Sequence, residues 1–367
     1  MSERIQMMTR GRAWAAVSLF AVLGLVLSAP AAEATYDPLA SGATRLSLDK
    51  SFLALLERNG VRLSTAAGSR LKAGTVKFPV SGGKFDPSDG KGTVEHEGTL
   101  LFLAGARRVP LRALLLRTTQ RRAPFSVKVG GGQLKLAEAG KVQVSRHGFG
   151  SRVEVSSLKL SAKVATRLDK KLGLRDVFEP GQLLGAAVTT ANPLTVAILG
   201  KNKVSLELDP AFLVKLQSLF VAVNPIFPAE HPGPFTLPIF GGTLAVDAAA
   251  GRVATEGALE FLQLGSGQVF WRDPTLDLDG AILAAEGEVE PSPPYAGKIG
   301  SVAIAAFARQ AVSANAKART ITASGSLSLD PSMAAIFNEA FAKPMQRDAV
   351  FQAGEQIGKL SFLASGE

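Results

Sequence analysis

The stretch FPVSGG at 78–83 returns as LPIFGG at 237–242, and this recurrence decides how the chain is organised. The two stretches are 159 positions apart, and the same offset pairs Gly98 with Gly257 and Phe102 with Phe261. A constant offset over about 25 residues predicts two copies of one domain in tandem. Two copies are too few for a solenoid, so each copy is expected to build its own hydrophobic core.

The similarity extends in both directions and sets the boundaries of the copies. Upstream, LSLDKSF at 46–52 resembles LELDPAF at 206–212. Downstream, FEPG at 178–181 resembles FQAG at 351–354, now 173 positions apart.

The larger offset means that the second copy holds about 14 extra residues. We expect them between Phe261 and Phe351, in loops such as the proline-rich stretch 290–294. The first repeat therefore runs from 45 to 190 and the second repeat from 203 to 364.

Residues 1–34 have the layout of a secretory signal peptide. Arginines precede an apolar run at 13–28, and Ala32-Glu33-Ala34 offers a cleavage site after Ala34. The apolar run is shorter than the roughly 20 residues that a membrane-spanning helix needs. The chain has no cysteine, so its stability must come without disulfides. These features predict a secreted or cell-surface protein.

Charge is distributed unevenly along the chain. The chain is 46% hydrophobic and 20% charged, as expected of a globular protein. Residues 35–200 hold 26 Lys and Arg against 12 Asp and Glu, whereas residues 201–367 hold 12 against 17. This asymmetry favours contact of the first repeat with an anionic cell-wall polymer or lipid surface, and the simpler alternative is a solvated charged face. The basic residues lack interleaved aromatic side chains, so we expect no nucleic-acid partner.

Local patterns predict a mainly β fold with short helices. One helix is expected from Asp49 to Asn59-Gly60, and its counterpart from Asp209-Pro210 along an apolar stripe that reaches Val223. The glycine pair at 82–83 is expected to form a turn. Further strands are expected at 75–80, 109–117, 125–129, 142–145, 153–164 (with a bend at 156–157) and 184–189, and a second helix at 165–172. The predicted fold is therefore two tandem sandwich-like antiparallel β domains, each with two short helices.

Catalytic motifs are absent from the sequence, so no enzyme is predicted. It contains no GxSxG, HExxH, P-loop or GxGxxG pattern, and only three histidines. His96 shares an apolar strand face with Gly98, which leaves space beside it, and such an imidazole can ligate iron or haem. The commoner alternative is a core histidine with satisfied hydrogen bonds. Arg107 and Arg108 could meet the carboxylates of a ligand.

These motifs together resemble the HtaA domain family of secreted and surface proteins of actinobacteria. Ser51-Phe52 matches the start of the family's first helix, and GTVEHEGTL at 92–100 matches its Gly- and His-containing strand. DPTL at 273–276 and the two Phe-x-x-Gly segments at 178–181 and 351–354 match its later motifs.

The resemblance implies haem capture by a tyrosine on the first helix, supported by a histidine. Here the tyrosine position is Leu55 in the first repeat and Lys215 in the second, while the histidine position is His96 and Thr255. The site predicted from the sequence therefore consists of His96, also the predicted metal ligand, with Gly98, Phe52, Arg107 and Arg108.

The first functional hypothesis is a non-enzymatic binding protein that holds haem or another amphipathic molecule between sheet and helix of the first repeat. The alternatives are a cell-surface or wall-associated structural or adhesion protein without a small ligand, and a lipid-binding carrier.

Overall fold

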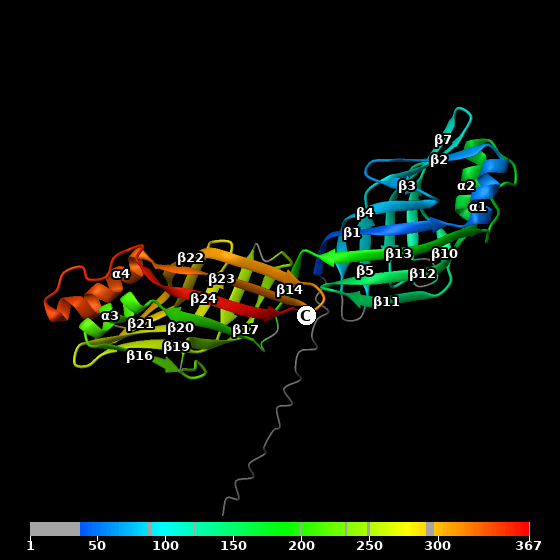
Figure 1. Ribbon diagram of the computed structural model, residues 1–367. Helices are drawn as coiled ribbons and strands as arrows, with labels where there is room; N and C mark the ends of the chain where they lie inside the picture. The colour runs from blue at the N-terminus through cyan, green and yellow to red at the C-terminus, as the bar shows by residue number, and fades with distance from the viewer. Residues whose placement is uncertain are drawn as a thin grey trace, which may run out of the picture. The chain divides into compact units, whose positions relative to one another are not determined.

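The computed structural model describes residues 37–86, 90–120, 122, 124–198, 200, 202–231, 233–247, 250–290 and 297–366. The predicted signal peptide, 1–34, lies outside these residues, as does most of the proline-rich stretch 290–294. Most of the described chain is β-strand in two antiparallel sheets, with four α-helices (Figure 1). None of the helices in this part of the chain is long and apolar enough to span a membrane. The predicted mainly β, antiparallel fold with short helices is confirmed.

The first sheet and its two helices are formed by the first repeat. The elements are β1 (Asp37–Leu48), α1 (Lys50–Arg58), β2 (Val61–Ala66), β3 (Arg70–Lys72), β4 (Thr75–Phe85), β5 (Gly92–His96), β6 (Thr99–Ala104), β7 (Arg107–Arg117), β8 (Phe125–Val129), β9 (Gly132–Lys135), β10 (Ala137–Ala139), β11 (Val142–His147), β12 (Gly150–Leu160), α2 (Ala162–Leu172) and β13 (Leu183–Pro193).

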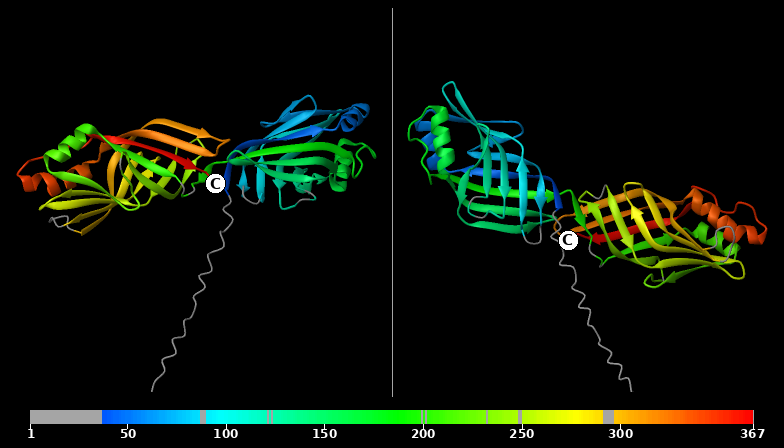
Figure 2. Two further views of the ribbon diagram at one scale, coloured as in Figure 1. Left: turned by 60° about the horizontal axis from the view of Figure 1, so that its bottom comes forward. Right: turned by 180° about the vertical axis from the view of Figure 1, so that it is seen from behind.

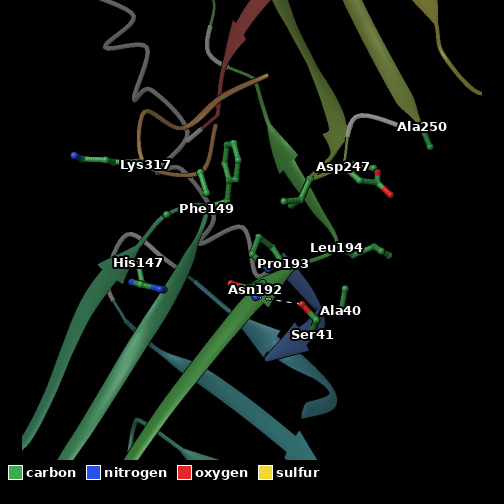
Figure 3. Close-up of a pocket in the computed structure, with 14 residues that line it drawn as sticks. Ala40, Ser41, His147, Phe149, Asn192, Pro193, Leu194, Asp247, Ala250 and Lys317 are labelled. Carbon is green, nitrogen blue, oxygen red and sulfur yellow. Dashed lines mark hydrogen bonds between the residues drawn. The ribbon is translucent and has the colours of Figure 1, made fainter. Parts of the chain in front are cut away.

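In the first sheet, β1 lies at the centre, because it pairs with both β13 and β4. The strand order from one edge is β10, β12, β13, β1, β4, β5, β7, β6 and β2. Where β1 begins, its register with β13 shifts between Leu39 and Ser41. The Asn192 side-chain amide there donates a hydrogen bond to Ser41 Oγ at 3.2 Å, which ties the two strands together (Figure 3).

The second sheet and the remaining helices come from the second repeat, except for β14, which precedes that repeat in the chain. The elements are β14 (Thr195–Ala197), β15 (Lys203–Leu208), α3 (Pro210–Ser218), β16 (Val221–Ile226), β17 (Phe235–Ala245), β18 (Gly251–Thr255), β19 (Ala258–Gln263), β20 (Gly267–Asp277), β21 (Ile282–Glu290), β22 (Gly297–Asn315), β23 (Thr320–Leu329), α4 (Pro331–Phe337), a π-helical turn (Asn338–Ala342), a 3₁₀ turn (Lys343–Met345) and β24 (Gln356–Ser365).

Strand pairings in the two sheets correspond. β15 pairs with β17 and β24 as β1 pairs with β4 and β13, and β16 pairs with β19 as β2 pairs with β6. One difference is that the second set of pairings closes on itself, because β22 joins β21 to β23. β22 is a single strand of 19 residues, so the extra length of the second repeat is not confined to loops as predicted.

The two glycine pairs that revealed the repeat do not form turns, and that prediction is wrong. Gly82 and Gly83 lie inside β4, where the register with β5 shifts, and Gly241 and Gly242 lie at the same kind of shift in β17. A Cβ on Gly83 would come within 2.2 Å of Thr93 O, and one on Gly242 within 2.1 Å of Arg252 O. The glycines are required because the bulge brings two backbones into contact.

The first helix of each repeat begins as the sequence predicts. The Asp49 carboxylate accepts the backbone N–H of Ser51 at 2.8 Å, and the Asp209 carboxylate accepts that of Ala211 at the same distance. α1 ends before Asn59-Gly60, as expected. α3, however, ends at Ser218, and the predicted continuation to Val223 is wrong. Leu219 and Phe220 make the turn that Asn59 and Gly60 make in the first repeat, and Val223 belongs to β16.

The bend predicted at 156–157 is present, since the pairing of β12 with β13 shifts between Val155 and Leu158. The following helix begins earlier than predicted, at Ala162, because Ser161 caps it by accepting the Val164 N–H. Val164 therefore belongs to α2 and not to the preceding strand.

Each sheet encloses an aromatic cluster close to its helices, and the helices of each repeat lie at one end of their sheet (Figures 1 and 2). In the first repeat the rings of Phe52, Phe102 and Phe178 contact one another, with centroids 6.0–6.5 Å apart. Their counterparts Phe212, Phe261 and Phe351 surround Phe337 in the second repeat. Phe102 and Phe261, which the constant offset pairs, are fully buried on corresponding strands.

Candidate functional site

His96 lies inside the first sheet with both ring nitrogens engaged. Its side chain is 4% exposed. Nδ1 is 3.0 Å from the Leu114 carbonyl oxygen, which can only accept, so Nδ1 carries the proton and donates it there. Nε2 then accepts from Thr44 Oγ1 at 2.7 Å, and Thr44 Oγ1 is 2.5 Å from Thr189 Oγ1. The result is a hydrogen-bonded chain of neutral groups across β7, β5, β1 and β13.

A bulge in β7 explains why a donor is needed at this position. Ala113 adopts a left-handed φ of 48°, and the register of β7 with β8 shifts between Arg112 and Leu115. The bulge turns the Leu114 carbonyl inward, where a buried acceptor without a partner would be costly. His96 supplies that partner.

The second repeat has the same bulge and a different partner. Asp273 has a φ of 45°, and the Pro274 carbonyl accepts a hydrogen bond from Thr255 Oγ1 at 2.6 Å. The shorter threonine needs no further hydroxyl groups, and apolar Val204 and Phe362 face each other where Thr44 and Thr189 do. The inward carbonyl of the bulge therefore has a hydrogen-bond donor in both repeats. In the first repeat the donor is His96, with Thr44 and Thr189 behind it. In the second repeat it is Thr255, and Val204 and Phe362 take the places of the two threonines.

Burial lowers the pKa of His96 to about 4, against a smaller opposing effect of the hydrogen bond to Leu114. The imidazole is therefore neutral at pH 7. To ligate iron, His96 would have to give up its bond to Thr44 or to Leu114 and become reachable. The role of His96 as a metal ligand stays a prediction, and it requires that one of these two hydrogen bonds breaks and that the ring becomes accessible.

The other predicted site residues belong to different surroundings. Phe52 is fully buried in the aromatic cluster. The space expected beside Gly98 is filled by Ser69, since a Cβ on Gly98 would meet Ser69 Cβ at 2.7 Å. Arg107 and Arg108 are exposed at the start of β7, and the Arg107 guanidinium lies against Gly173 at the end of α2. Among the described residues, His96 forms its hydrogen bonds with Thr44 and Leu114 and with none of these four.

The positions that the family resemblance assigns to an iron-binding tyrosine are also occupied differently. Leu55 is half-buried on α1. Lys215 on α3 forms an ion pair with Glu355, and both side chains are largely buried, with exposed fractions of 29% and 18%. The ammonium group also lies 6.0 Å from the centre of the Phe351 ring. A lysine held in an ion pair is protonated and has no lone pair for iron.

A groove of about 870 Å³ lies beside α3 in the second repeat. Its floor is formed by Leu213 and Leu216 of α3, Val221 and Val223 of β16, and Phe235 of β17. This volume falls in the range of roughly 300–1,000 Å³ that is usual for small-molecule sites. Leu213 and Leu216, three positions apart on α3, line the groove together with residues of the edge strand β16.

The rim of the groove exposes large apolar side chains. Phe220 is 74% exposed and Leu264 is 84% exposed. Phe220 also adopts a left-handed φ of 56°, which is strained for a bulky residue. The Gln263 side-chain amide holds this turn in place, because its Nε2 donates to Leu219 O at 2.5 Å and to Phe341 O at 3.2 Å. An exposed aromatic ring on a strained backbone is a feature associated with binding sites.

His231 completes the rim with a polar group. It follows β16 in an exposed loop, and its ring stacks on Phe235 with centroids 4.8 Å apart and an angle of 18° between planes. Among the described residues, no hydrogen bond is made by the ring nitrogens of His231. A fixed ring with accessible nitrogens can accept a metal-containing or polar ligand group.

The first repeat lacks this groove's apolar rim. Gly60, with a φ of 62°, occupies the place of Phe220, and Arg62 occupies the place of Ala222. The groove was not predicted from the sequence, because Phe220 falls within the apolar stripe that was expected to continue the helix to Val223. The alignment of Phe220 with Gly60 could have revealed it. A glycine at this position indicates a turn after the helix, and a side chain placed at such a turn is exposed.

No group of three or more His, Asp or Glu side chains positioned to hold a metal ion occurs in the described ranges. The groove combines an apolar surface with three polar side chains, those of His231, Glu207 and Gln217.

Comparison with known proteins gives a likeness of fold. No family model and no curated protein matches the sequence. Among solved structures, the C-terminal domain of HtaA from Corynebacterium glutamicum is similar to 46% of this chain, with 98% of that domain covered, 15% identity and a TM-score of 0.37. The N-terminal domain of the same protein is similar to 45% of this chain, with 97% covered, 16% identity and a TM-score of 0.33. HtaA domains are the family that the sequence motifs resemble.

Proposed function

We propose that this protein is a non-enzymatic, secreted or surface-exposed binding protein that holds an apolar or amphipathic ligand in the groove beside α3. The single observation that carries the proposal is the exposure of Phe220 and Leu264 around an apolar groove of about 870 Å³. Soluble proteins rarely leave large side chains exposed together without a binding role.

Haem is the first candidate ligand. The motif resemblance implies haem capture, and haem combines a flat apolar ring with charged carboxylates. The floor and Phe220 supply apolar contact, and His231 supplies an imidazole at the rim. In this proposal His231 takes the place of the tyrosine that neither Leu55 nor Lys215 provides, and the site differs from the one predicted around His96.

Two measurements test the proposal. Native mass spectrometry of the purified protein should identify a co-purifying amphipathic molecule, which also separates haem from a lipid. Titration with hemin should shift the Soret band, and His231→Ala should change the band position and weaken binding by roughly five- to 30-fold, since a ligand bond is lost.

The control is Phe240→Ala, which removes a 69% exposed phenylalanine outside the groove and should leave the titration unchanged. Hemin binding that survives His231→Ala and is abolished by His96→Thr would instead assign haem to the first repeat.

A further inference from the structure

We propose that the outer face of the first sheet binds a linear phosphate polymer through a row of three cations, Arg70, Lys77 and Arg45. This surface belongs to the other repeat and is independent of the groove beside α3.

The register of three strands brings the cations together. Arg70 of β3 lies directly opposite Lys77 of β4, and Lys77 lies directly opposite Arg45 of β1. Directly opposed residues of antiparallel strands point to the same face. With neighbouring strands about 4.8 Å apart, the row spans roughly 10 Å. All three side chains are exposed.

Within the described ranges, no carboxylate neutralises the row. None of the three forms an ion pair with an acidic side chain in the part of the chain that the structure describes. The nearest acidic residue along the same row is Glu154, beyond Val188, and it is paired with Arg152 at 2.5 Å. Opposed like charges repel each other across strands, so a bound anion would relieve an unfavourable arrangement.

The corresponding row of the second repeat carries no such charge. There Glu230 lies opposite Thr236, which lies opposite Ser205. Glu230 is moreover paired with Lys203. The same strand geometry is thus cationic in the first repeat and neutral to acidic in the second, in agreement with the excess of 26 basic over 12 acidic residues in 35–200.

The surroundings of the row favour a phosphate polymer over a membrane or a nucleic acid. No large exposed hydrophobic side chain occurs on β1, β3 or β4, so nothing there would insert into a bilayer. No aromatic side chain on the outer face of these strands could stack on a base; Phe78 and Phe85 are buried. A straight row of point charges suits a chain that offers a phosphate at regular intervals.

The test is binding of fluorescently labelled inorganic polyphosphate to the purified protein, followed by anisotropy. Three phosphate contacts predict a slope of log K against log salt of roughly −2, so affinity should fall by roughly 20-fold between 50 and 200 mM salt. Arg45→Ser with Lys77→Thr installs the residues of the second repeat. This double variant should weaken binding at 50 mM salt by roughly tenfold or more and flatten the salt slope.

The matched control is Lys163→Gln with Lys170→Gln, which removes the same charge from the exposed side of α2. It should retain wild-type binding within about twofold. Equal losses in both variants, or none in either, would overturn the proposal. Binding to vesicles of phosphatidylglycerol without binding to polyphosphate would also overturn it, as would tighter binding to single-stranded DNA of equal charge.

Discussion

Acid should destabilise the first repeat through His96, because a neutral imidazole is buried there. The pKa of His96 is lowered to about 4 in the folded protein, against an ordinary value of 6.5 in the unfolded chain. Between pH 6.5 and pH 4 the unfolded chain therefore binds a proton that the folded protein does not. The free energy of unfolding must fall as the pH falls through that interval.

The size of the loss follows from the difference in pKa. Each unit corresponds to about 1.4 kcal/mol, so the full effect is on the order of 3 kcal/mol once the pH reaches 4. This is a large share of the 5–15 kcal/mol that is typical of a domain. Carboxylates with a lowered pKa, such as Asp49 and Asp277, lose their contributions to the free energy of unfolding at lower pH than His96 does. The two effects can therefore be separated.

Two assays measure this effect. In a two-dimensional NMR spectrum of the imidazole groups, only His96, His147 and His231 contribute, and His96 should titrate near pH 4. Urea denaturation followed by circular dichroism between pH 7 and pH 4 gives the free energy. Trp271 fluorescence is unsuitable, because it reports on the second repeat.

The comparison protein is a triple variant, Thr44→Val, His96→Thr and Thr189→Phe. It places in the first repeat the three residues that the second repeat has around its inward carbonyl. Its first repeat should lose about 3 kcal/mol less than the wild type over the same pH range. A His96 titration near pH 6.5, or equal losses in the two proteins, would refute the description of His96 as a buried neutral member of the network.

Three further predictions concern packing and domain structure. Phe102→Ala and Phe261→Ala should each cost about 3–5 kcal/mol by urea denaturation, because both rings are fully buried; a loss below 1 kcal/mol would contradict the aromatic cores. Phe220→Gly should change stability by less than about 1 kcal/mol, because relief of the left-handed φ offsets the small area that this exposed ring buries; a loss like that of Phe261→Ala would show that the ring is part of the core. We propose that the repeats 45–190 and 203–364, extended to whole strands as 37–193 and 195–365, fold separately, so each alone should show a cooperative thermal transition; an unfolded fragment would contradict this.

The internal repeat made much of the fold predictable. A constant offset fixed which strands correspond, and the bulge glycines proved to be equivalent, although their conformation was assigned to a turn. A glycine pair marks either a turn or a close backbone approach, and only the pairing partner Thr93 or Arg252 distinguishes them. The end of α3 was missed because Leu219 and Phe220 continue a helical spacing that the tertiary structure does not use.

The site was less predictable, because it depends on contacts between distant segments. His96 could be placed on an inward face from the sequence, but its partners Thr44 and Leu114, and Thr189 that bonds to Thr44, come from three other strands. The groove likewise requires α3, β16 and the loop around His231 to lie side by side.

The most direct test of the groove as the binding site is the affinity for hemin of a protein carrying Phe220→Gly and His231→Ala together. The wild type and the Phe240→Ala control should bind alike, and the double variant should bind at least tenfold more weakly while its thermal unfolding stays close to that of the wild type. Each lost contact is expected to contribute about 1–2 kcal/mol, which corresponds to roughly five- to 30-fold. Unchanged affinity of the stably folded double variant would contradict the groove as the ligand site.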